Sequence, residues 1–419
     1  MNTSTVAFRC VLSNSHALAQ GEQMLYLLVE VGAPDVPLSR RSPLNLCLTL
    51  DQSGSMHGEK LNEAKEAAKE VTGLLEDADY CSLVAFHGRP SVMSGARPMD
   101  GRGKRGLQGA IDGLSATDGT DILAALRLAH AELKKRRVQE AVNGLLLLSD
   151  GQDSSSTDDL RREAEACLKD GIGISTVGLG DDHDEDKMSA IALAAGGQFL
   201  YAQQPSEVGP FFQDQTRRML ELAVRKLSVR LVPSRHVSIQ RLLNDNYQPS
   251  QRRPSRPERG DEWMVPLYDM SRGDTQSLIF EIHCAHPMEG EFRIAQAELT
   301  YELTEGGPGT ANQDIILIYT SDMTAIRAGR NVEVLRRREE LNVANVLVDT
   351  MTKLKRGQLS AAQAAQQLDS ANAQLLRHGQ SDVTDELTRT IRKVSQGDTS
   401  SQTVKISTQI ATRIKQVGK

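Results

Sequence analysis

The chain lacks an uninterrupted apolar run long enough to cross a membrane as a helix. Such a helix needs about 20 consecutive apolar residues, and no stretch of the 419-residue sequence approaches that length. The first residues, Met1 to Thr5, also lack the basic start and apolar core of a secretory signal. We therefore expect a cytoplasmic protein with no membrane span.

Cysteine is scarce and has no metal-binding spacing. The five cysteines are an odd number, and none of them forms a C-x-x-C pair. This pattern indicates neither a disulfide framework nor a zinc site. We expect reduced thiols, several of them buried, at Cys10, Cys47, Cys81, Cys167 and Cys284.

An excess of basic residues is absent too. The formal net charge is −6, which argues against nucleic acid as a general partner. The sequence contains neither the glycine fingerprint of a dinucleotide-binding fold nor a G-x-x-x-x-G-K-[ST] loop. We therefore expect no ATP binding through such a loop.

Strand-like and helix-like segments alternate between residues 42 and 222. Leu44 to Leu50 and Tyr80 to Phe86 are strand-like, and Lys60 to Leu75 between them places its apolar residues on one helical stripe. Further strands are expected at Gly144 to Ser149 and Ile172 to Val177. This alternation is typical of an α/β, Rossmann-like domain with a parallel sheet between helices.

The segments on either side of this domain are predicted to be β-structure. Residues 1–40 hold two strand patterns, Val6 to Leu12 and Gln23 to Val31, and residues 224–320 hold several more. A two-stranded hairpin on its own is only marginally stable and has unpaired edges, so it needs further strands to pair with. We therefore predict that residues 1–40 join residues 224–320 in one β-sandwich, with the 42–222 domain inserted between them.

The pattern changes to helices over residues 330–395. Ala361 to Leu376 is an Ala- and Gln-rich helical pattern, and Arg356-Gly357-Gln358 separates it from the preceding one. Two arrangements are open, a single helical-repeat hairpin or a small helical bundle packed on the sandwich. Residues 396–419 are rich in Ser, Thr and Gln with few large apolar residues, so we expect a mobile tail there.

Three segments place oxygen-bearing side chains after strands or before a helix. Asp51-Gln52-Ser53-Gly54-Ser55 follows the first strand pattern, Thr120 precedes the helical pattern from Ile122, and Asp150 follows the run that ends at Ser149. Ligands bind beyond the carboxyl ends of strands in open parallel sheets. Hydroxyl and carboxylate oxygens suit Mg²⁺ or Mn²⁺ rather than zinc.

The three segments together resemble the metal-ion-dependent adhesion site of von Willebrand factor type A domains. The resemblance covers roughly residues 42–222, and it implies that the hydroxyls and the carboxylates hold Mg²⁺, or else Mn²⁺ or Ca²⁺. The implied ligands are Asp51, Ser53, Ser55, Thr120 and Asp150. Gly58-Glu59 stands where adhesive receptors of the family often carry an acidic pair for a neighbouring calcium site, so we expect one metal site only.

The resemblance also implies a protein-binding function without catalysis. Neutral hydroxyl ligands leave the ion positively charged, and in the family an Asp or Glu of a partner protein fills its free position. A second hypothesis is an accessory subunit of a AAA+ ATPase machine of the MoxR or chelatase kind. A third is a metal-dependent hydrolase, for which His57 is the histidine nearest to the serines in sequence.

Overall fold

The computed structural model describes residues 5–19, 21–37, 41–135, 141–150, 154–180, 184–244, 251–253, 262–285, 288–377, 382–398 and 400–416. The chain divides into two compact units. The central unit comprises residues 39–222 and 400–412, and the flanking unit comprises residues 1–38, 223–399 and 413–419.

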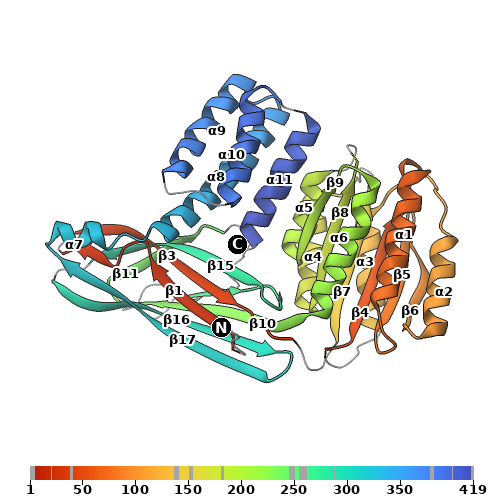
Figure 1. The fold of residues 1–419 in the computed structure, drawn as a ribbon, viewed down its shortest axis with the longest axis horizontal. Coiled ribbons are helices and arrows are strands. Elements are labelled where there is room, and N and C mark those ends of the chain that lie inside the picture. The colour runs from red at the N-terminus through yellow and green to blue at the C-terminus, as the bar shows by residue number, and fades with distance from the viewer. Residues whose placement is uncertain are drawn as a thin grey trace. The chain divides into compact units, whose positions relative to one another are not determined.

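A six-stranded sheet forms the middle of the central unit (Figure 1). Its order is β6-β5-β4-β7-β8-β9, and all neighbouring pairs are parallel except β5 and β6 at one edge. The strands are β4 (Leu44–Asp51), β5 (Tyr80–Phe86), β6 (Ser91–Pro98), β7 (Val142–Ser149), β8 (Ile172–Leu179) and β9 (Gly196–Ala202). Every residue of β4 is buried, because this strand has neighbours on both edges and helices on both faces.

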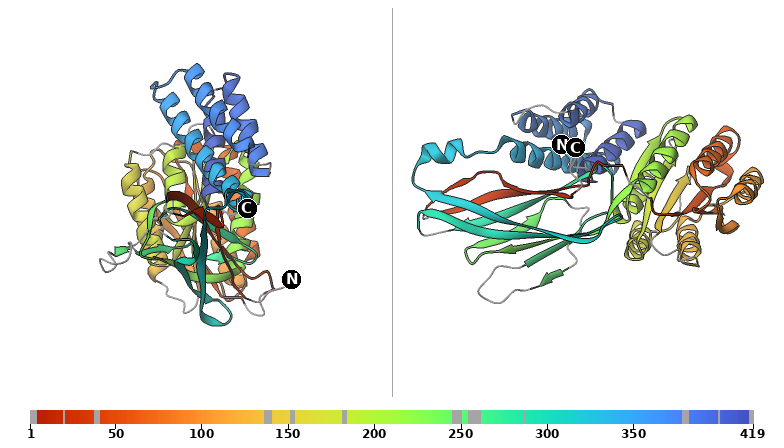
Figure 2. Two further views of the ribbon diagram at one scale, coloured as in Figure 1. Left: turned by 90° about the vertical axis from the view of Figure 1, so that its left-hand side faces the viewer. Right: turned by 60° about the horizontal axis from the view of Figure 1, so that its bottom comes forward.

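Helices cover both faces of this sheet (Figure 2). They are α1 (Glu59–Leu74), α2 (Gly101–Asp112), α3 (Ile122–Lys135), α4 (Thr157–Lys169), α5 (Glu185–Ala194) and α6 (Val208–Leu220). One core contains side chains of α1, α2 and α6, and the other contains side chains of α3, α4 and α5. The predicted stripe of α1 is confirmed, because its apolar residues from Leu61 to Val71 are buried. The α/β fold with a mostly parallel sheet is thus confirmed.

Two sheets of the flanking unit enclose a separate core. One has the order β1-β3-β15-β11, with β1 (Ala7–Leu12), β3 (Glu22–Gly32), β15 (Thr275–Ala285) and β11 (Val237–Leu242). The other has the order β12-β13-β10-β16-β17-β2, with β12 (Gln251–Arg253), β13 (Glu262–Pro266), β10 (Leu222–Pro233), β16 (Gly290–Leu303), β17 (Gly307–Thr320) and β2 (His16–Leu18). A short strand, β14 (Met270–Ser271), pairs with β10.

The N-terminal strands belong to this flanking unit, as predicted. β3 pairs antiparallel with β15 along its whole length, from Glu22 opposite Ala285 to Gly32 opposite Thr275. Leu27 and Val29 of β3 lie in the same buried core as Phe280 of β15 and residues of β10, β16 and β17. The central unit is therefore inserted into the sequence of a β-sandwich.

Helices follow the sandwich and pack on one another. They are α7 (Met323–Ala328), α8 (Val332–Lys355), α9 (Ala361–Leu376) and α10 (Asp382–Ser395). Gly357 ends α8 with a positive φ of 69°, and Ser360 begins α9 with a capping box, so the predicted break between the two helices is confirmed. α9 packs against both α8 and α10, as expected for a small bundle. No helix in the described part of the chain is both long and apolar enough to cross a membrane.

The prediction of a mobile tail over residues 396–419 was wrong for most of that segment. Residues Ser401–Gln416 form helix α11. Ile410, Ala411 and Ile414 are buried, and their spacing places them on one helical face. A few apolar residues at helical spacing are enough to bury one face, even where the overall composition is polar.

Candidate metal centre

The first loop of the centre begins where β4 ends. Asp51 is the last residue of β4 and is fully buried. Its carboxylate accepts a hydrogen bond from the Ser53 backbone N–H at 2.7 Å and one from the Ser149 hydroxyl at 2.5 Å. These two donors, one from its own loop and one from the end of β7, hold the carboxylate in a fixed orientation.

Asp150 reaches the same place from the neighbouring strand. β4 and β7 are parallel neighbours, with Leu50 opposite Leu148, so their carboxyl ends meet. Asp150 is also fully buried, and its Oδ1 accepts a hydrogen bond from the Ser55 hydroxyl at 2.6 Å. The Ser53 and Ser55 hydroxyls are 3.0 Å apart. Four of the five predicted ligands therefore form one cluster.

The fifth predicted ligand, Thr120, lies on a loop joined to the first one. The Thr117 N–H donates to the Gln52 carbonyl at 2.7 Å, and the Gly88 N–H donates to the Asp118 carbonyl at 3.5 Å. Gly119 has a φ of 92°, and a Cβ there would lie 2.9 Å from the backbone of Gly88. The described contacts include no hydrogen bond between the Thr120 hydroxyl and the other four side chains, so the loop position alone associates it with the centre.

Lys60 is a residue of this centre that the sequence analysis missed. It is the second residue of α1, and its ammonium forms an ion pair with Oδ2 of the buried Asp150. No motif signals this role, because the pair joins two segments that are distant in sequence. Asp51, Asp150 and Lys60 together carry one net negative charge when all are ionised, so a divalent ion bound there would keep net positive charge.

The burial of Asp51 opposes its ionisation. Its pKa is raised to about 6, mainly by burial and to a small extent by the charge of Asp150, while the hydrogen bonds from Ser149 and Ser53 act in the opposite direction. Burying an anion without an opposite charge is unfavourable. A cation beside Asp51 would remove this penalty, because it favours the charged carboxylate.

The donor set fits a hard divalent cation. All of the candidate ligand atoms in the cluster are carboxylate or hydroxyl oxygens, which Mg²⁺ and Mn²⁺ prefer. The exposed Ser55 and Gly54 leave one side of the cluster open to solvent. His57, at the end of the 3-10 turn Gly54–Met56, is exposed, and no described contact joins it to Asp51 or Asp150.

The sequence of the central unit matches a known domain family. Residues 45–215 match the von Willebrand factor type A domain. The chain is 28% identical over 317 residues to protein sll0103 of Synechocystis sp., a match that spans 74% of this chain and 73% of that protein.

Two solved structures share the fold. A von Willebrand factor type A protein from Catenulispora acidiphila has a TM-score of 0.73 at 19% identity and covers 93% of this chain and 91% of its own. The ArnB paralog VWA2 from Sulfolobus acidocaldarius has a TM-score of 0.65 at 14% identity and covers 98% of both chains. The family match places the von Willebrand factor type A domain at residues 45–215, and antiparallel sheets and C-terminal helices accompany it.

Proposed function

We propose that the centre binds one divalent cation, Mg²⁺ in the first instance, and that the cation receives an Asp or Glu carboxylate from a partner protein. The proposed ligands are Asp51, Ser53, Ser55, Thr120 and Asp150. The observation that carries the proposal is the convergence of two fully buried carboxylates, Asp51 and Asp150, with two serine hydroxyls at the carboxyl ends of β4 and β7.

Charge balance supports a bound cation. The charge of Asp150 opposes the ionisation of Asp51, and Lys60 forms its ion pair with Asp150. The hydrogen bonds that Asp51 accepts come from neutral groups, namely the Ser53 backbone N–H and the Ser149 hydroxyl. A divalent ion shared by both carboxylates would stabilise the two charges together.

The coordination chemistry supports a carboxylate as the incoming group. Mg²⁺ takes six oxygen ligands, and three hydroxyls with one or two carboxylates leave at least one position free. Because hydroxyls are neutral, the ion keeps a positive charge that attracts an anionic oxygen. A non-enzymatic binding role is favoured over hydrolysis, since no described contact joins the exposed His57 to the two aspartates and hydrolysis needs a positioned base.

The proposal is tested by measuring Mg²⁺ binding to the full chain by titration calorimetry. Asp51→Ala should weaken binding by at least about 100-fold, because it removes a buried charged ligand. The matched control is Asp112→Ala, which removes an exposed carboxylate of the same unit and should leave the affinity unchanged. Equal Mg²⁺ affinity in wild type and Asp51→Ala would contradict the metal site.

The partner is tested separately by affinity capture from an extract of the source cells. Wild type in Mg²⁺ should retain a protein that is lost in EDTA and lost with Asp51→Ala. Asp112→Ala should retain it. Capture that is insensitive both to EDTA and to Asp51→Ala would move the interaction to another surface and contradict the bridging role, even if Mg²⁺ binding itself is confirmed.

A further inference from the structure

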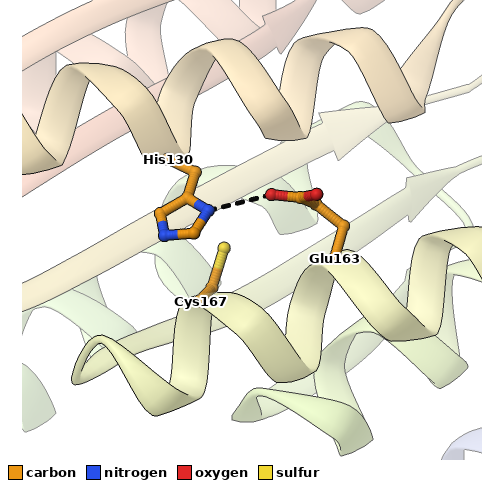
Figure 3. A group of neighbouring side chains, drawn as sticks. All are labelled: His130, Glu163 and Cys167. Atoms are coloured by element: carbon orange, nitrogen blue, oxygen red, sulfur yellow. Dashed lines mark hydrogen bonds and ion pairs between the residues drawn. The ribbon is translucent and has the colours of Figure 1, made fainter.

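A second group of metal-ligating side chains lies between α3 and α4. His130 belongs to α3, and Glu163 and Cys167 are one turn apart on α4. One ligand atom from each of the three residues lies within 4.8 Å of the other two. Figure 3 shows the imidazole facing the Glu163 carboxylate, with the Cys167 sulfur directed toward the ring.

The three side chains form a partly enclosed site, and they differ in how deeply they are buried. Cys167 is fully buried in the core beneath α3 and α4, whereas the side chains of His130 and Glu163 keep 11% and 17% of their surface exposed. The thiol therefore forms the floor, and the nitrogen and carboxylate lie nearer to solvent. An ion could reach the group without opening the central sheet.

Both ring nitrogens of His130 face carboxylates. Nδ1 is 2.8 Å from Glu163 Oε1, and Nε2 is 2.8 Å from Asp170 Oδ2. A neutral imidazole donates through one nitrogen only, so the other contact needs a second proton or a metal cation. In metal sites the ring nitrogen that does not bind the ion commonly donates to a carboxylate, which fixes the ring. Asp170, itself paired with Lys134 at 2.6 Å, is placed for that role.

We propose that His130 Nδ1, the Glu163 carboxylate and Cys167 Sγ bind one Zn²⁺ ion, with Asp170 orienting the imidazole through Nε2–H. Nitrogen, sulfur and oxygen donors are the set that zinc prefers, and three protein ligands leave a fourth tetrahedral position for water. A thiolate ligand also separates this site from the oxygen-only centre at Asp51, because Mg²⁺ and Ca²⁺ prefer oxygen.

Metal binding must displace the thiol proton. Burial raises the pKa of Cys167 to about 12, and the nearby Glu163 and Asp170 charges act in the same direction. Zn²⁺ binds the thiolate, so the S–H proton leaves to solvent as the Zn–S bond forms. No oxidant or reductant takes part.

The zinc site would link α3 and α4, the helices that follow the loops with Thr120 and Asp150. α3 begins at Ile122, two residues after Thr120, and α4 is the first helix after Asp150. A zinc ion between them would fix their relative position. This role differs from the proposed carboxylate-binding role and does not depend on it.

Cobalt substitution distinguishes the two metal sites. The full chain is kept in excess Mg²⁺ and titrated with Co²⁺, whose thiolate complexes show a charge-transfer band in the near ultraviolet. Wild type should develop the band with one equivalent of Co²⁺, and added Zn²⁺ should remove it. Cys167→Ser should abolish the band, and His130→Gln should weaken Co²⁺ binding at least tenfold.

Two controls separate this result from other causes. Cys10→Ser, which alters another buried thiol, and Asp51→Ala should both keep the band. Circular dichroism verifies that each variant is folded, and His130→Gln decides the question if Cys167→Ser does not fold. Absence of the band in wild type, or a band that persists in folded Cys167→Ser, would overturn the zinc site while leaving the proposal at Asp51 untouched.

Discussion

The ammonium of Lys60 forms an ion pair with the buried carboxylate of Asp150 at the candidate metal centre. Lys60 lies on α1 and Asp150 follows β7, 90 positions later. A cation held by Asp150 must therefore share this carboxylate with a fixed positive charge. The positive charge of Lys60 would repel a cation bound at Asp150.

Removing the Lys60 charge should tighten Mg²⁺ binding. Lys60→Met keeps most of the unbranched side chain and removes its repulsion of the ion, so we expect about tenfold higher affinity, or roughly 1.4 kcal/mol, for charges a few ångströms apart near the surface. Titration calorimetry at low ionic strength measures this. Lys69→Met is the matched control on the same helix, with nearly equal side-chain exposure, and should change nothing. Weaker binding by Lys60→Met would show that the ammonium supports the centre.

Gly119 should be indispensable to the loop that carries Thr120. Its φ of 92° disfavours side chains, and a Cβ would lie 2.9 Å from the backbone of Gly88. Gly119→Ala should therefore displace the loop, destabilise the fold by about 1–3 kcal/mol and weaken Mg²⁺ binding. Gly113→Ala, whose added Cβ would meet nothing closer than 3.5 Å, serves as the control. Normal Mg²⁺ affinity in Gly119→Ala would remove Thr120 from the ligand set.

Acid should destabilise the central unit through Asp79. Burial raises the pKa of this carboxyl, but hydrogen bonds from Arg41 and from two backbone amides outweigh burial, and the pKa lies below its usual value. The folded state thus prefers the ionised carboxylate. The stabilisation is present above the unfolded pKa of about 3.9 and is lost as the pH falls through the lower folded pKa.

The Asp79 prediction is tested by urea unfolding between pH 7 and pH 3. Arg41 bonds both carboxylate oxygens of Asp79, at 2.7 and 2.8 Å. Asp79→Asn should lower the free energy of unfolding at pH 7 by about 3 kcal/mol and flatten its decline below about pH 4. Asp112→Asn, at an exposed ion pair, should stay within about 0.5 kcal/mol of wild type. An Asp79→Asn protein as stable as wild type would contradict the prediction.

Helix α11 should be ordered in solution. Lys405 donates to the Gly180 carbonyl at 3.4 Å, and the Tyr201 N–H donates to the Gln409 side chain at 3.3 Å, so the helix has specific contacts within the central unit. Hydrogen exchange should show protected amides over residues 401–416. Ile410→Asp should abolish that protection, because it buries a charge. Exchange at the rate of an unstructured peptide in wild type would restore the prediction of a mobile tail.

Local patterns predicted much of the fold. The apolar run of β4, the stripe of α1 and the break at Gly357 each depend on a short local sequence pattern. Each was found where predicted. β6 and α2 had no place in the predicted alternation. β6 is an edge strand with mostly half-buried or exposed residues, and α2 is glycine-rich with only two large apolar residues, Leu107 and Ile111, so each gives a weaker sequence signal than a fully buried element.

The candidate centre was predicted by a combination of short motifs. Asp51, Ser53 and Ser55 share one loop, and Asp150 follows a strand whose neighbour is β4. Parallel strands bring their carboxyl ends to one edge, so the sheet order alone predicts that these residues meet. Lys60 could not be predicted in this way, since a lysine in the first turn of a helix has no signature of the strand end that it contacts.

By itself, the sequence determined the class of the fold and the oxygen-bearing side chains at one end of its sheet, because period, run length and loop composition are local properties. Only the tertiary structure decided which helices become neighbours. It placed Lys60 against Asp150, and it brought Cys167, which has no C-x-x-C spacing, beside His130 and Glu163. These contacts depend on how helices pack against the sheet and against one another and not on the separation of their residues along the chain, so such clusters leave no periodic signal in the sequence.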